Sequence, residues 1–274
     1  MKYAFVLPGG SALEQLEQAV LAEQAGWDGI FVWEAAYGVD AWSLLAAICV
    51  RTAGIQVGTL LTPLPWRRPW KVASQVATVD QLSGGRAILS VGIGALGTDL
   101  PETGEPTDVR ERAEMLDEGI DLIRTLWSGG TSYEGSHYHY EGGSRPDLIA
   151  AVGPARRSVP IWVVGVWPRP KSMRRAARCD GVIPQYQLAD GREADPEDAR
   201  AVRRWLDGHG ASHVDLIAEG ETPADDAVEA ARRVDLWREA GATWWIENRW
   251  SLPELDATGI RVVTERLEAG PPRA

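Results

Sequence analysis

The sequence predicts a single (β/α)8 TIM barrel that spans residues 1–274 and carries a short insertion between its fourth helix and its fifth strand. Short apolar runs alternate with amphipathic segments along the whole chain, which is typical of βα units around a parallel sheet. Eight such pairs are found, and eight is the number that closes this kind of barrel. The length of 274 residues and the 45% of hydrophobic residues fit one domain of this architecture.

Eight segments have the length and apolar character of buried strands. In chain order, the expected strands are Tyr3 to Leu7, Gly29 to Trp33, Ile55 to Leu61, Ala87 to Ile93, Ile161 to Val166, Gly181 to Tyr186, Val214 to Ala218 and Thr243 to Glu247. The expected helices alternate with them and are Ala12 to Ala25, Ala41 to Thr52, Lys71 to Leu82, Val109 to Trp127, Lys171 to Arg178, Glu197 to His209, Ala224 to Ala240 and Pro253 to Leu267. In the last helix the proline stands in the first turn, where a missing N–H costs little.

Two of these helices carry clear local signals. In the third, an apolar stripe is followed by glycines, where a chain that leaves a helix often needs a positive φ. The stripe is Val72, Val76, Val79 and Leu82, and the glycines are Gly84 and Gly85. In the fourth, Asp108 and Glu111 have the spacing of a capping box, which predicts that this helix begins at Val109.

The stretch 129–160 is too long for a plain loop between a helix and a strand. Its tyrosine-rich core, SYEGSHYHY, predicts a small hairpin or lid. His137 and His139 lie in this core at a spacing that could place both on one face of a strand. No third imidazole is close in sequence, so we expect no metal site.

The charge balance bears on possible partners. A formal net charge of −11 and a pI near 4.9 argue against nucleic acid, because backbone phosphates would be repelled. The first residues lack the pattern of a signal peptide, and no apolar run approaches the roughly 20 residues that span a bilayer. We therefore expect a cytoplasmic protein that acts on a small-molecule substrate, with Cys49 and Cys179 as structural thiols.

In barrels of this type, the active site lies at the C-terminal ends of the strands. The residues at these ends are mostly apolar or glycine, which favours a flat aromatic ligand over a sugar or a metal chelate. Gly92, Gly94 and Gly97 form a GxGxxG pattern, but prolines separate it from the next helix, so a Rossmann turn is disfavoured. The first two of these glycines could instead let a planar ring approach the backbone. Trp33, Trp167 and Trp250 are placed to contact such a ligand.

The loop after the fifth strand, GVWPRPKSMRRAAR, is the strongest candidate anion site. Gly165 and Trp167 end the strand, and Arg169, Lys171 and Ser172 supply two positive charges and a hydroxyl group beside a helix N-terminus. A cofactor phosphate would be stabilised there. The alternative is that these basic residues are simply solvated on an acidic protein.

Three carboxylates also lie at or just past expected strand ends: Glu34, Glu219 and Glu247. A pair of them could act as general acid and base in a carboxylate-dependent hydrolase. Each could equally be the partner of a structural ion pair.

The run VGTLLTPLPWRRPWKVASQVATVDQLSGGRAILSVGIGA, from Val57 to Ala95, resembles the signature of the bacterial luciferase-like family of flavin- and deazaflavin-dependent oxidoreductases. AEQAGWDGIFVWE, RERAEMLDEGIDLIRTLWSG, VPIWVVG and AGATWWIE extend the likeness over nearly the whole chain. The resemblance implies a barrel that binds FMN or the deazaflavin coenzyme (F-420), with the phosphate at Arg169, Lys171 and Ser172. It also implies a homodimer formed through the second and third helices.

The resemblance implies two further features of the site. Relatives often carry a distorted third strand, commonly with a non-proline cis peptide, that presses on the ring; here Leu60, Leu61 and Thr62 match that segment. Many relatives have Asp-His after the second strand, whereas this chain has Glu34 followed by Ala35. Glu34 is then the first candidate for the catalytic polar role, with Glu247 and Tyr186 behind it.

The expected function is therefore hydride transfer or oxygenation of a small organic substrate, with the cofactor carrying the electrons. Two alternatives stay open at this point. One is a non-catalytic flavin-binding member of the same fold, suggested by the missing histidine, and the other is the carboxylate-dependent hydrolase.

Overall fold

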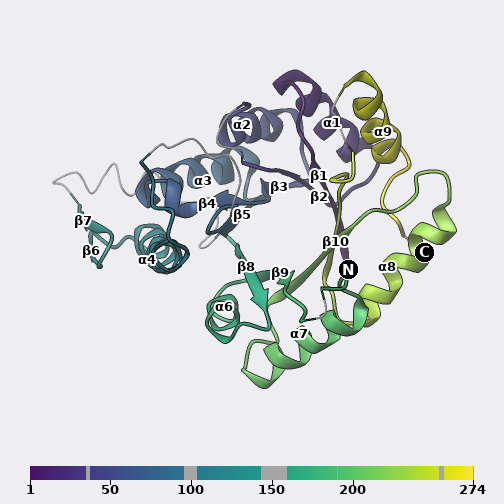
Figure 1. Ribbon diagram of the computed structural model, residues 1–274. Helices are drawn as coiled ribbons and strands as arrows, with labels where there is room; N and C mark the ends of the chain where they lie inside the picture. The colour runs from purple at the N-terminus through teal and green to yellow at the C-terminus, as the bar shows by residue number, and fades with distance from the viewer. Residues whose placement is uncertain (35–37, 96–103, 143–158, 190, 253–255, 274) are drawn as a thin grey trace.

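The chain forms a closed parallel barrel surrounded by helices (Figure 1). The computed structural model describes residues 1–34, 38–95, 104–142, 159–189, 191–252 and 256–273. The barrel strands are β1 (Lys2–Leu7), β2 (Gly29–Val32), β3 (Gln56–Thr59), β5 (Ala87–Gly92), β8 (Ile161–Trp167), β9 (Gly181–Tyr186), β10 (Asp215–Gly220) and β11 (Trp244–Glu247). Each strand pairs in parallel with the next, and β1 pairs with β11 to close the ring. The predicted fold class and its eight strands are confirmed.

The third strand is interrupted, which the sequence had only suggested through the resemblance. β3 ends at Thr59, and the chain resumes pairing with β5 as the short strand β4 (Thr62–Pro63). Between them lies a non-proline cis peptide bond, Leu60–Leu61, at the position where the family likeness predicted one. The short 3-10 helix η1 (Leu64–Trp66) follows directly.

The helices lie outside the strands, as Figure 1 shows. They are α1 (Ala12–Gln24), α2 (Ala41–Arg51), α3 (Pro69–Ser83), α4 (Val109–Trp127), α6 (Pro170–Ala176), α7 (Pro196–Gly208), α8 (Ala227–Glu239) and α9 (Ala257–Glu268). Acidic or hydroxyl side chains accept hydrogen bonds from the first-turn N–H groups of six of them, and these N-cap residues are Ser11, Asp40, Asp108, Asp195, Asp226 and Asp256.

These caps correct two expected boundaries. Helix α8 begins at Ala227 and α9 at Ala257, three and four residues later than expected, because Asp226 and Asp256 cap them. Pro253, expected in the first turn of the last helix, lies outside the described residues. Helix α3 ends as predicted at Gly84, whose φ of 68° is left-handed. Leu82, however, is 48% exposed and does not belong to the buried stripe.

The expected hairpin is present and lies outside the ring of helices, beside α4 (Figure 1). Strands β6 (Ser132–Glu134) and β7 (His139–Glu141) pair in antiparallel fashion. The loop between them is held by Glu118 of α4, which accepts hydrogen bonds from three successive backbone N–H groups of residues 136–138. Tyr138 packs against Met115 and Leu122 of the same helix.

The barrel has two apolar layers. The larger cluster lies between the strands and the helices, and the smaller one fills the barrel interior. Phe31, Trp162 and Trp244 meet inside with ring centroids 5.0–6.3 Å apart, and the Lys2 ammonium lies over the Trp244 ring from the N-terminal end. Glycines on neighbouring strands make room for these rings: a Cβ on Gly181 would lie 2.3 Å from Trp162 Cδ1.

Candidate active site at the C-terminal mouth of the barrel

The alternation of side chains along each strand decides which residues reach the mouth. Ile217, Ile246 and Ile183 belong to the interior cluster. Side chains two residues further along these strands therefore face the open end above them. On β9 and β10, these are Gln185 and Glu219, and Trp33 occupies the matching place after Phe31 of β2. Trp33 is 44% exposed, and its indole N–H donates to the carbonyl of Pro8 at 2.9 Å.

The cis peptide segment contributes to the rim of the mouth. Leu60 packs in the interior cluster, and Leu61 lies against Gly92 of β5. A Cβ on Gly92 would lie 2.9 Å from Leu61 Cδ2, so any larger residue here would require the Leu61 side chain to move. Thr62 is buried, with its hydroxyl 3.0 Å from that of Thr59. Leu61 and Gly92 thus share an apolar rim, while Thr62 stabilises the strand break behind it.

Gly94 supports this rim from behind. Its φ is 84°, and a Cβ there would lie 2.6 Å from the ring of Trp66. The glycine therefore allows the chain after β5 to pass close to that indole. Gly97, the third glycine of the pattern, lies outside the described residues, and α4 begins only at Val109. Residues 93–95, which directly follow β5, are not helical, whereas a Rossmann turn leads straight into a helix.

Three predicted site residues lie on the outer face of the barrel. Gly165 faces α6, because a Cβ there would lie 3.2 Å from Met173 Sδ. Trp167 and Tyr186, which are register partners on β8 and β9, pack against the cluster between strands and helices. Burial raises the pKa of Tyr186 well above its usual value, and Asp198 and Asp195 add to the effect. These placements point Gly165, Trp167 and Tyr186 away from the mouth.

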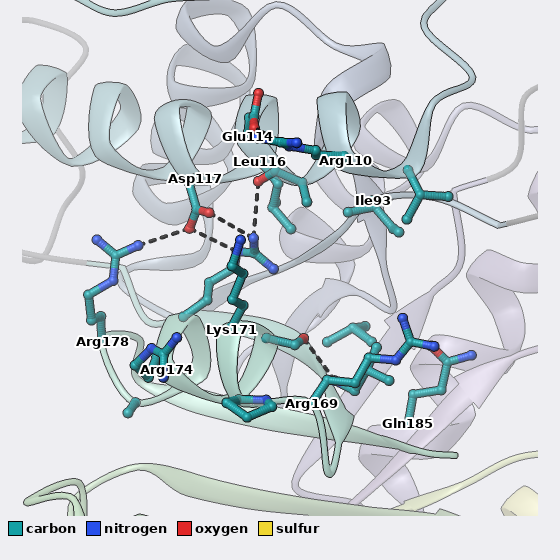
Figure 2. Close-up of a pocket in the computed structure, with 18 of the residues that line it drawn as sticks. Ile93, Arg110, Glu114, Leu116, Asp117, Arg169, Lys171, Arg174, Arg178 and Gln185 are labelled. Atoms are coloured by element: carbon teal, nitrogen blue, oxygen red, sulfur yellow. Dashed lines mark hydrogen bonds and ion pairs between the residues drawn. The ribbon is translucent and has the colours of Figure 1, made fainter.

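A cavity of about 1150 Å³ begins at the mouth and extends between α4 and α6 (Figure 2). Ile93, Val164 and Val166 line its apolar end, and Arg169, Lys171 and Ser172 line the part at the start of α6. The Ser172 hydroxyl accepts a hydrogen bond from Val166 N at 2.9 Å, which leaves its hydrogen free to donate. The structure therefore brings the three predicted phosphate ligands to one wall of one cavity.

Two further arginines, Arg175 in α6 and Arg178 just after it, are engaged with α4. Arg175 donates to Asp117 Oδ2 at 2.7 Å, and Arg178 donates to Asp117 Oδ1 at 2.9 Å. Figure 2 shows Arg178 and Asp117 joined by this bond, with both residues away from Arg169. By contrast, the side chains of Arg169 and Lys171 are exposed, and neither forms an ion pair with another described residue.

Glu34 forms an ion pair rather than facing the mouth. Its carboxylate accepts from Arg67, and its other oxygen accepts from Trp42 Nε1 at 3.2 Å. Its side chain is only 8% exposed. Arg67 also donates to Gln75 Oε1 at 2.7 Å, and burial lowers the pKa of this arginine. The contacts of Glu34 therefore join the segment after β2 to α2 and to the chain before α3.

Glu247 is fully buried in a network on the outer face of the barrel. Its carboxylate accepts from Arg249 Nη1 at 2.6 Å, from Trp245 Nε1 at 3.0 Å and from both the N–H and the hydroxyl of Thr222. Arg266 of α9 lies 3.4 Å away. Every oxygen is engaged, so these contacts give Glu247 a structural role. The three carboxylates at the strand ends are therefore not brought together as a hydrolase pair.

Glu219 is the carboxylate that the structure places at the mouth. It is level with Ile246 in the register of β10 and β11, and it remains exposed to the opening. Desolvation by the surrounding barrel wall raises its pKa, while the nearby Trp250 and Asn248 side chains partly offset this rise. The sequence showed Glu219 at a strand end but not on which face. The missing signal was the register with the neighbouring strand.

Two other findings concern the described residues. No group of three or more His, Cys, Asp or Glu side chains that could hold a metal is found among them, and His137 and His139 contact Glu114 and Glu134 respectively. Within the same ranges, every helix is too short or too polar to cross a bilayer.

Comparison with known proteins gives a consistent result. An F420-dependent glucose-6-phosphate dehydrogenase from Amycolatopsis mediterranei is 37% identical over 134 residues, which cover 45% of this chain and 40% of that protein. Another from Beutenbergia cavernae is 30% identical over an alignment of 292 residues including gaps, and this alignment covers 89% of this chain and 85% of that protein. For several relatives, including the first of these two, the matched part of the chain spans only about half of the relative's length or less.

A solved structure supports the fold. An F420-dependent secondary alcohol dehydrogenase, in complex with an F420-acetone adduct, superposes with a TM-score of 0.76 over 98% of both chains at 20% identity. The model of the family described as luciferase-like monooxygenase matches residues 4–257. Because this match spans most of the 274 residues, the protein belongs to the luciferase-like monooxygenase family.

Proposed function

We propose that the protein is an oxidoreductase that uses the deazaflavin coenzyme F420 to exchange a hydride with a small organic substrate. The observation that carries this proposal is one cavity that joins the apolar side chains of Ile93, Val164 and Val166 to exposed cations on an otherwise acidic chain. A redox cofactor with a planar ring and a phosphate tail has this distribution of polarity. The dehydrogenase relatives favour the deazaflavin over FMN, which is the alternative cofactor.

The donor set fits the phosphate of such a cofactor. Arg169 and Lys171 would neutralise its charge, and the Ser172 hydroxyl would donate one hydrogen bond. Val164 and Val166, next to this wall, would contact the ring on the side of the barrel axis. Leu61, whose side chain covers the backbone of Gly92, would add apolar contact area at the rim of the mouth.

When bound, the cofactor supplies the hydride chemistry. The chain would contribute orientation and a dry site. Trp33 stands at the mouth with its ring fixed by the hydrogen bond to Pro8, so it can shield one side of a bound substrate from water. Glu247, Gly165, Trp167 and Tyr186 are not included in this proposed site, because their side-chain positions face the helices.

Titration of the purified protein with deazaflavin and with FMN tests the proposal. We expect tight binding of the deazaflavin, and binding of neither cofactor would contradict it. Lys171→Gln should weaken binding by about tenfold or more, since a charge-assisted hydrogen bond contributes about 1.5–3 kcal/mol. Arg204→Gln is a matched control, because it removes one charge from an exposed position on α7.

We also propose a cytoplasmic homodimer formed through α2 and α3. Two apolar side chains on these helices support this, since Val50 is 65% and Leu82 is 48% exposed. Sedimentation velocity of the double variant Val50→Asp, Leu82→Asp should show monomers where the unmodified protein sediments as a dimer. Cell fractionation would test the location.

A further inference from the structure

The position of Glu219 sets it apart from the other acidic groups of the barrel. It lies two residues beyond Ile217, which fills the interior, and it is level with Ile246 of the next strand. Gln185, two residues beyond Ile183 on the other side, lines the large cavity. The carboxyl group of Glu219 therefore stands at the open end of the barrel, at the level where the cavity begins.

The partners of Glu219 are also unusual. Glu34 and Glu247 are both bound to arginines. Glu219 instead forms no ion pair within the described residues, and the polar side chains that influence its carboxyl group, Trp250 and Asn248, are neutral. A carboxyl group without a cationic partner can keep or release a proton with little change in its surroundings.

The charged groups on the surrounding segments are engaged elsewhere or lie in solvent. Arg249 and Glu247 bind each other on the outer face of β11. Glu221, after β10, accepts from Ser251. On the side of β8 and β9, the charged group is Arg169, which is exposed at the start of α6. Glu219 thus lies level with Gln185 in the strand register and near Asn248 and Trp250, and all three of these side chains are neutral.

We propose that Glu219 is the catalytic proton acceptor for a substrate that carries a hydroxyl group on the carbon to be oxidised. The carbon–hydrogen bond breaks, and its hydride passes to the oxidised deazaflavin. The O–H bond also breaks, its proton passes to the Glu219 carboxylate, and a carbonyl group forms. The substrate thus loses two electrons and two hydrogens, and Glu219 then releases its proton to solvent through the mouth.

The reverse reaction uses the same group as a proton donor. A carbonyl oxygen that receives a hydride at its carbon needs one proton, and the protonated Glu219 carboxyl supplies it. Burial raises the pKa of Glu219, so the range in which its carboxyl group titrates moves toward neutral pH. There the same group can accept a proton during oxidation of the alcohol and donate one during reduction of the carbonyl. The inference rests on the proposed function, because it requires a hydride acceptor bound beside the mouth.

The test compares Glu219→Gln with Asp225→Asn, which makes the same change in charge at an exposed position on the loop after β10. The probes are oxidised deazaflavin with 2-propanol or glucose 6-phosphate. We expect Glu219→Gln to lower kcat by about 100-fold or more, the usual contribution of a general acid or base. It should leave the deazaflavin Kd within about twofold, because Glu219 acts in the proton-transfer step and not in binding the coenzyme. The rise of kcat with pH should disappear in this variant and persist in Asp225→Asn.

A second readout does not depend on turnover. Infrared difference spectra recorded against pH should contain a protonated-carboxyl band that titrates above the usual range for glutamate. This band should be absent from Glu219→Gln and present in Asp225→Asn.

The possible failures can be separated. Binding of the deazaflavin without oxidation of either alcohol would overturn the assignment of a hydroxyl substrate. A Glu219→Gln rate equal to that of the unmodified protein, or a Glu219 band that titrates at or below the usual range, would overturn the role of Glu219. Failure to bind the deazaflavin would instead contradict the proposed function, and the infrared titration would still report on Glu219.

Discussion

Two glutamates at the ends of neighbouring strands, Glu219 of β10 and Glu247 of β11, face opposite sides of the barrel wall. Glu247 points outward, where two arginines, a threonine and a tryptophan bind its carboxylate in the dry layer beneath the helices. Glu219 points inward to the mouth, with the neutral side chains of Trp250 and Asn248 nearby and with access to solvent. In this register, Glu219 is level with Ile246, and Glu247 is level with Gly220. The same side chain therefore becomes a structural element or a candidate catalyst according to the face of the strand that carries it.

The largest expected effect concerns the outer glutamate. Glu247→Gln leaves Arg249 and Arg266 buried without their anion, and breaking such a pair costs about 3–5 kcal/mol. Urea denaturation should show this loss in the free energy of unfolding. Glu219→Gln is the matched comparison and should not destabilise the protein. A Glu247→Gln variant as stable as the unmodified protein would remove the distinction between the two faces.

The second prediction concerns the closed end of the barrel, below both glutamates. Gly181→Ala would place a Cβ 2.3 Å from Trp162 Cδ1, and overpacking of this kind costs about 1–3 kcal/mol. Thermal unfolding should show a lower Tm. Gly208→Ala is the control, because a Cβ there meets nothing within 4 Å. Equal Tm values for the two variants would show that the aromatic rings can move aside.

The smallest effect concerns the pH dependence of stability at Glu219. Its raised pKa means that, above the usual range, the folded state holds a proton that the unfolded state has released. Stability contributed by this site therefore falls as pH increases from the usual value of about 4.3 to the raised value. The Tm of Glu219→Gln should match that of the unmodified protein in acid and exceed it at higher pH. A Tm difference between the variant and the unmodified protein that becomes smaller as pH rises would contradict the direction of the pKa shift.

The sequence predicted the order of strands and helices well, because hydrophobic periodicity and glycine positions are local signals. It could not predict side-chain direction at the strand ends. Parallel barrel strands are buried on both faces, so Gly165, Trp167 and Tyr186 look the same in sequence whether they face the mouth or the helices. Arg169, Lys171 and Ser172 line one cavity as neighbours because one short segment carries all three, and their role as phosphate ligands stays a prediction. Helix starts were missed where the Asp caps at 226 and 256 override apolar pattern.

The aromatic rings packed at the N-terminal end have a consequence for kinetics. Phe31, Trp162 and Trp244 pack together at that end, and Lys2 lies over the Trp244 ring, so among the described residues these side chains fill the barrel axis there. Coenzyme and substrate would then both enter from the C-terminal end. If they use the same entrance, the molecule that enters last would leave first, which predicts ordered binding with product departing ahead of the coenzyme.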